Sequence, residues 1–150
     1  MKVKVFFVVF SLSLMAGCSA TFRLYPVQGP LSAQTPLPVF FGKVTGVVNS
    51  GNVSFTLADG EVCKGTWTRV VPADPSTSMS SVWDAVYGSG YFTSHVLGAK
   101  LYAHAAITGS RGTVLTVEFY RPNPGSEQIR VFGVAKDSKD NVYKMAFHTV

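Results

Sequence analysis

Two turn signals divide residues 44–67, which read VTGVVNSGNVSFTLADGEVCKGTW. Ser50 and Gly51 suit a two-residue hairpin loop, which sets the residues on either side of it opposite one another. The resulting pairs are Val48 with Val53, Gly46 with Phe55 and Val44 with Leu57. Because these pairs share one apolar face, the turn and the side-chain pattern agree in predicting a β-hairpin.

A second turn falls at residues 58–60, where Gly60 can take the left-handed conformation of a three-residue loop. This turn pairs Phe55 with Cys63 and Val53 with Gly65, and it carries Trp67 to the same face. Cys63 then points into the core, where we expect a small buried hydrophobic residue in place of a reactive thiol.

Two more hairpins are predicted in the second half of the chain. The loop at residues 110–112 pairs Ile107 with Leu115, Ala105 with Val117 and Ala103 with Phe119, and on the other face His104 with Glu118. The loop at residues 137–141 pairs Val131 with Phe147, Gly133 with Met145 and Ala135 with Tyr143, and on the other face Arg130 with His148. Each register separates apolar from polar residues, which favours the strand assignments.

The pattern changes between these two blocks, in residues 72–99. Apolar residues there follow the i, i+3, i+4, i+7 spacing of an amphipathic helix. They are Met79, Val82, Trp83 and Val86. Ser78 can cap the start of this helix and Gly88 can end it, so we predict one short helix.

These elements predict an all-β fold, a small curled antiparallel sheet or barrel-like domain of about six to eight strands with one short helix. Several inward positions are small, which lets a sheet curl tightly. These positions are Gly46, Gly65, Ala103, Ala105 and Gly133.

The amino terminus has the pattern of an export signal. Lys2 and Lys4 precede an apolar stretch of residues 5–15. At about 11 residues this stretch is shorter than the roughly 20 that a membrane-spanning helix needs, and small residues follow it. We therefore predict that residues 1–17 are a cleaved signal peptide.

The end of this segment, Leu14-Met15-Ala16-Gly17-Cys18, resembles the lipobox of bacterial lipoproteins. The resemblance implies that Cys18 becomes the acylated amino terminus, carrying a diacylglycerol thioether and a further fatty acid such as palmitate. Several acyl chains give stable anchoring where a single chain is marginal. The alternative is an ordinary secretory signal that happens to end near a cysteine.

Three regions are expected: the lipoprotein signal peptide at 1–17, a lipid-attached linker with a possible first strand at 18–40, and a β-rich globular domain at 41–150. The linker is rich in Ser, Pro, Gln and Gly, as expected of a tether. Ser19 directly after the lipidated cysteine resembles the sorting signal of Gram-negative lipoproteins. It implies a cell envelope location in the outer membrane, facing the periplasm.

Charge and cysteine content narrow the choice of partners. The net charge is +5, but the basic residues are scattered singly, so no nucleic-acid surface is predicted. If Cys18 carries lipid, Cys63 has no intramolecular partner. Its thiol is then either buried and inert or available for pairing with another chain.

The sequence contains no constellation that predicts catalytic, metal-binding or cofactor-binding residues. Its histidines, His95, His104 and His148, have no motif spacing. We expect His104 and Glu118 to form a structural cross-strand contact on an exposed face. Turns account for Asp59, Asp137 and Asp140, because aspartate accepts local backbone hydrogen bonds.

Residues 24–32, 57–67 and 109–145 together resemble a group of small, uncharacterised proteobacterial lipoproteins. The resemblance covers most of the chain after the signal peptide. It implies envelope localisation and a single β-rich domain, and it carries over no catalytic residues.

The sequence favours a membrane-anchored envelope lipoprotein that is a non-enzymatic binding or structural module, with an envelope protein, glycan or lipid as partner. One alternative is a periplasmic carrier that holds a small apolar ligand inside the curled sheet, in the manner of a lipocalin. Another is a hydrolase of envelope polymers. The carrier is ruled out if aromatic side chains fill the interior and leave no cavity of ligand size; the expected ones are Phe55, Trp67, Phe119 and Phe147.

Overall fold

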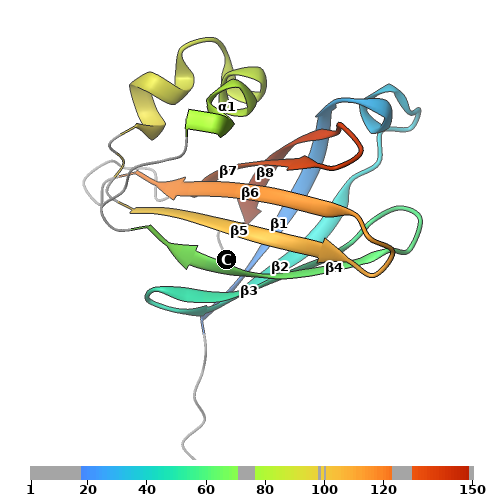
Figure 1. The fold of residues 1–150 in the computed structure, drawn as a ribbon, viewed down its shortest axis with the longest axis horizontal. Helices are drawn as coiled ribbons and strands as arrows, with labels where there is room; N and C mark the ends of the chain where they lie inside the picture. The colour runs from blue at the N-terminus through green and yellow to red at the C-terminus, as the bar shows by residue number, and fades with distance from the viewer. Residues whose placement is uncertain (1–17, 71–76, 98, 100, 123–129, 149–150) are drawn as a thin grey trace, which may run out of the picture.

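The computed structural model describes residues 18–70, 77–97, 99, 101–122 and 130–148. The predicted signal peptide lies outside these residues. Eight antiparallel strands form a closed barrel in chain order, which confirms the all-β prediction (Figure 1). The strands are β1 (Cys18–Gln28), β2 (Phe40–Val47), β3 (Ser50–Thr56), β4 (Val62–Arg69), β5 (Leu101–Gly109), β6 (Val114–Arg121), β7 (Phe132–Asp137) and β8 (Val142–His148).

Strand β1 closes the barrel because it pairs with a neighbour along each of its edges. Leu24 lies opposite Phe40 of β2 on one side and opposite Met145 of β8 on the other. Closure leaves no free sheet edge for pairing with another chain. The strand begins at Cys18, which lies opposite Gly46, so the region expected as a linker with a possible first strand does contain that strand, and part of it belongs to the barrel wall.

Most of the predicted registers are confirmed. Phe55 lies opposite Cys63 between β3 and β4, and the predicted pairs of β5 with β6 are all present. Between β7 and β8, Gly133 pairs with Met145 and Ala135 pairs with Tyr143. The pairs proposed for Val131 and Arg130 lie beyond the end of this ladder, because both residues precede β7.

The register predicted for β2 and β3 is wrong by four residues. Val44 pairs with Val53 and Gly42 with Phe55, so the chain turns at Val48 and Asn49. Both registers keep the same residues on the inner face, and the apolar pattern therefore does not distinguish them. Gly51 is a position of close approach in β3, where a side chain would overlap the carbonyl oxygen of Thr45.

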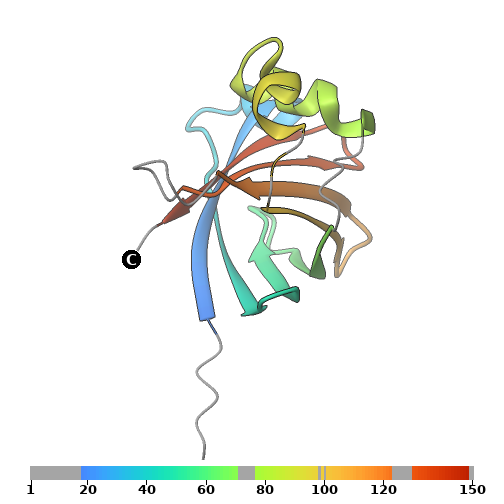
Figure 2. The same ribbon diagram turned by 90° about the vertical axis from the view of Figure 1, so that its left-hand side faces the viewer.

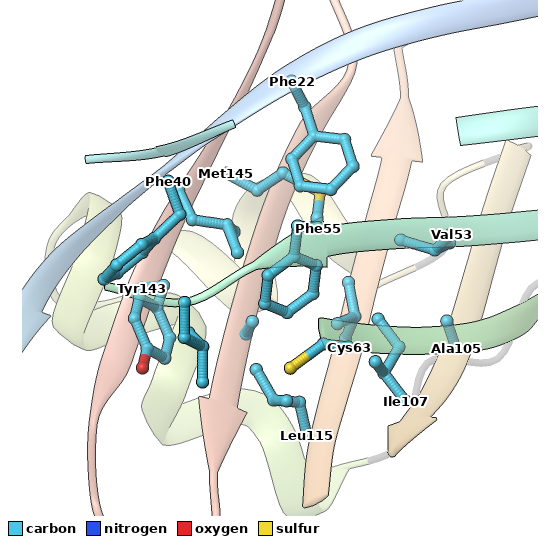
Figure 3. Close-up of a cluster of buried hydrophobic side chains, with 14 residues drawn as sticks. Phe22, Phe40, Val53, Phe55, Cys63, Ala105, Ile107, Leu115, Tyr143 and Met145 are labelled. Carbon is cyan, nitrogen blue, oxygen red and sulfur yellow. The ribbon is translucent and has the colours of Figure 1, made fainter. Parts of the chain in front are cut away.

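The barrel interior is filled by side chains (Figure 3). Phe22, Phe55 and Tyr143 are buried in this core, and Trp67, Phe119 and Phe147 pack against it. Cys63 is fully buried there, as predicted. Glycines make room for the larger groups: a Cβ at Gly42 would overlap the Phe22 ring, and one at Gly65 would overlap the Ala106 carbonyl oxygen.

Helix α1 (Ser80–Tyr87) confirms the predicted helix, but its N-cap residue is Met79 and not Ser78. Gly88 ends it with a φ of 111°, a conformation that favours glycine. Short helical turns lie at η1 (Pro30–Ala33), η2 (Thr77–Met79) and η3 (Phe92–Val96), the last with π-helical hydrogen bonding. Among the described residues, no helix is both long enough and apolar enough to cross a membrane.

The helical segment packs on the outer face of β5 to β8, above these strands in Figure 1. Trp83 has no exposed surface and stacks with Tyr87 at 5.7 Å between ring centroids. It also lies 5.5 Å from the Tyr120 ring on β6. A second apolar core therefore lies outside the barrel, between the sheet and the helices.

Replacing Gly65 by valine should open or distort the barrel, because the added side chain meets the backbone of β5. We expect the free energy of unfolding to fall by about 3 kcal/mol or more, the upper end for overpacking. Urea unfolding followed by circular dichroism measures the change. Thr66→Val is the matched control, since the neighbouring residue is exposed and points outward. Equal stability of the two variants would contradict the packing described here.

Candidate functional site

The two ends of the barrel differ in structure. One end, here called the closed end, carries η1 and the tight turns that follow β3, β5 and β7. The other, here called the open end, carries Cys18, the β2–β3 turn and the long connections between β4 and β5 and between β6 and β7. Figure 2 shows β1 beginning beside the β2–β3 hairpin at the open end.

Glu61 holds the closed end together, although the sequence analysis did not single it out. Its side chain is fully buried, and Oε1 accepts hydrogen bonds from the backbone N–H groups of Arg111 (2.9 Å) and Thr113 (3.0 Å). Oε2 accepts one from the Thr113 hydroxyl (2.6 Å), and Lys139 Nζ lies 3.5 Å away. The Thr113 hydroxyl and the other donors lower the pKa of Glu61 to about 2.

Asp137 organises the adjacent turn in the same way. Its Oδ1 accepts hydrogen bonds from the backbone N–H groups of Lys139 and Asn141, both at 2.8 Å. Its Oδ2 accepts the hydroxyl of Tyr143 (2.6 Å), and burial together with this carboxylate raises the pKa of that tyrosine. The predicted turn role is confirmed for Asp137 and also for Asp59, which accepts the backbone N–H of Glu61 (3.0 Å). These bonds give the closed end a structural role.

The open end contains an apolar cleft of about 190 Å³. Its lining residues are Val48, Trp67, Arg69, Tyr102, Ala103, Phe119, Arg121 and Val131. The Trp67 indole N–H donates to the Thr45 carbonyl (3.0 Å), and its ring meets Phe119 edge to face at 5.9 Å. Fixed aromatic side chains thus form much of the wall.

Among the described residues that line this cleft, two are charged, and both are arginines. Arg69 and Arg121 lie two residues after Trp67 and Phe119, so they continue the inward-facing rows of β4 and β6. The Nε atom of Arg69 is buried and has no hydrogen-bond partner among the described residues. Buried donors of this kind normally find an acceptor, so an anionic group in the cleft would satisfy it.

The predicted pairing of His104 with Glu118 is confirmed, but the expectation of an exposed face is wrong for Glu118. Helix α1 covers that carboxylate, which accepts a hydrogen bond from the Trp83 indole N–H at 2.8 Å. Burial raises the pKa of Glu118, opposed by hydrogen bonds from Tyr102 and Trp83. The sheet register alone did not reveal this cover, because the helix comes from a distant part of the chain.

The three histidines lie on separate elements. His104 is on β5, His148 ends β8, and His95 is in η3, where its ring stacks on Tyr91 at 4.5 Å. Within the described ranges, no three His, Cys, Asp or Glu residues gather in a way that could hold a metal ion. Burial raises the pKa of the Cys63 thiol to about 11, whereas Cys18 is exposed.

Neither protein-family models nor curated proteins nor solved structures provide a match to this chain. The fold itself defines a class, that of small closed antiparallel β-barrels with eight strands. The features particular to this chain are the hydrogen-bonded closed end and the aromatic, arginine-bearing open end.

The two buried glutamates should affect stability in opposite directions with pH. The lowered pKa of Glu61 means that its ionised form stabilises the fold above about pH 4.5, and this contribution is lost as the pH falls toward 2. The raised pKa of Glu118 means that its contribution is present at low pH and is lost as the pH rises. Stability should therefore rise less steeply with pH in Glu61→Gln and more steeply in Glu118→Gln than in the wild type.

Urea unfolding at a series of pH values from about 2 to 7 measures how the free energy of unfolding changes with pH in the wild type and in both variants. The two variants control for each other, because each replaces one buried carboxylate by an amide of the same shape. If the free energy of unfolding of Glu61→Gln changed with acidic pH as it does in the wild type, the assignment of Glu61 as the ionised centre of the closed end would be contradicted.

Proposed function

We propose that this chain is a lipid-anchored protein of the bacterial envelope, acylated on Cys18 and held at the outer membrane facing the periplasm. The observation that carries the proposal is the lipobox-like stretch that ends at Cys18, together with the exposure of that cysteine at the first residue of the barrel. An exposed thiol at the start of β1 can carry acyl chains without disturbing the core. The resemblance to small proteobacterial lipoproteins supports the same location.

Within this location, the proposed role is that of a non-enzymatic binding or structural module that works through its open end. Its buried carboxylates support this role, because each is already held by the fold. Glu61 is bound by the β5–β6 turn, Asp137 by its own turn and Tyr143, and Glu118 by Trp83. The cleft beside Trp67 instead offers apolar walls and two cations.

The second candidate is a carrier of a small apolar ligand, and the apolar cleft is the observation that favours it. The packed interior leaves no room for such a ligand among Phe55 and its neighbours, so we place the ligand in the cleft at the open end. Native mass spectrometry of the gently purified chain tests this candidate. An added mass that disappears on denaturation supports the carrier, and a bare protein mass contradicts it.

Replacing Cys18 by alanine should abolish lipid attachment. In bacteria fed radiolabelled palmitate, we expect the wild type to be labelled and to sediment with membranes, and the Cys18→Ala chain to carry no label. The chain's other cysteine provides the control: Cys63→Ala removes a thiol that is buried in the core, so its label should persist. A soluble, unlabelled wild type would contradict the anchor and favour an ordinary secretory signal.

A further inference from the structure

The proposed lipid would lie directly against the open end of the barrel. Cys18 is the first residue of β1 and pairs with Gly46, so no spacer separates it from the barrel wall. The adjoining β2–β3 turn exposes two valines: Val47 is 73% exposed and Val48 is 80% exposed. These are the most exposed large apolar side chains among the described residues. An exposed apolar tip beside an acylated residue favours contact with lipid.

The cleft next to this turn carries groups that are complementary to the polar region of a phospholipid. Val48 belongs both to the exposed tip and to the cleft lining, so the two surfaces are continuous. Arg69 and Arg121 face the cleft, and within the part of the chain that the structure describes the buried Nε of Arg69 has no hydrogen-bond partner. Guanidinium groups bind phosphate through charge-assisted hydrogen bonds. Trp67 adds an amphipathic ring of the kind found where membranes meet water.

We infer that the open end of the barrel is a membrane-docking face, in which Val47 and Val48 enter the bilayer interface and Arg69 and Arg121 bind the phosphate of an anionic phospholipid. The orientation rests on the proposed lipid anchor at Cys18. The arginine site does not need the acyl chains, because its geometry comes from β4 and β6. The barrel would thus be held at two points, by its lipid and by its open end.

A second surface of the barrel could also contact a membrane, and variants in the two surfaces distinguish them. The outer wall of β2 to β4 exposes Phe41, Lys43 and Lys64, which line a shallow groove away from the open end. A barrel lying on this wall would also bring an apolar ring and two cations to a membrane. The open end is favoured because Cys18 and the unpartnered Arg69 nitrogen are both there.

The test uses vesicle flotation with the chain that begins at residue 18, which contains all eight strands, carrying Cys18→Ser to prevent oxidation. Vesicles of phosphatidylcholine alone are compared with vesicles that contain one quarter phosphatidylglycerol. We expect binding to the anionic vesicles that is lost in high salt, because exposed charges are then screened. Binding should weaken at least about tenfold in Arg69→Gln/Arg121→Gln.

Two further variants complete the design. Lys43→Gln/Lys64→Gln removes the same amount of charge from the outer wall and should leave binding within about twofold of the starting chain. If the double arginine variant loses its circular dichroism signal and is therefore unfolded, the single variant Arg121→Gln is used in its place to measure the loss of vesicle binding. Loss of binding only in the lysine variant, or equal binding to neutral vesicles, would overturn the inference. The tested chain carries no acyl group, so a lack of vesicle binding would not contradict the proposed lipid anchor at Cys18. Conversely, if palmitate labelling fails, vesicle binding by the open end can still be measured.

Discussion

Strand β1 is hydrogen-bonded along both of its edges, and this double pairing closes the barrel. Pairing with β2 on one side and with β8 on the other turns an eight-stranded meander into a closed barrel. Glycines on the inner face make room for groups on the neighbouring strands: a Cβ at Gly42 would overlap the Phe22 ring of β1, and one at Gly65 would overlap the backbone of β5. Since side chains fill the interior, a ligand or partner would have to bind at the ends of the barrel or on its outer wall.

The two ends of the barrel satisfy their polar groups differently, and this difference is the reason for placing the proposed function at the open end. At the closed end, Glu61 and Asp137 accept hydrogen bonds from neighbouring turns and hold those turns together. At the open end, aromatic rings form much of the wall, and no described residue provides an acceptor for the buried Nε of Arg69. A fully bonded polar cluster rigidifies a protein, whereas an unsatisfied donor beside an apolar cleft suits a partner from outside the chain.

Much of the barrel could be predicted from the sequence because several hairpins carry two signals at once. Around residues 110–112 the turn glycine and the alternating apolar residues specify the same register, and the structure has it. Around Gly51 two registers differ by four residues and expose the same face, so the pattern did not choose between them. Contacts distant in sequence left no local signal: the hydroxyl that binds Glu61 is 52 residues away, and the indole that binds Glu118 is 35 residues away. The cleft arginines had a signal, because they extend the inward rows of Trp67 and Phe119.

The proposed orientation places the open end of the barrel against the membrane. The chain's two tryptophans can test this orientation directly, because Trp67 lines the open end, whereas Trp83 belongs to helix α1 and is buried. The measurement is tryptophan fluorescence of the lipidated protein in vesicles with brominated phospholipids, compared with its Trp67→Phe variant. We expect quenching in the wild type that disappears in Trp67→Phe, where only Trp83 still emits. Equal quenching in both proteins, or none in either, would contradict this orientation.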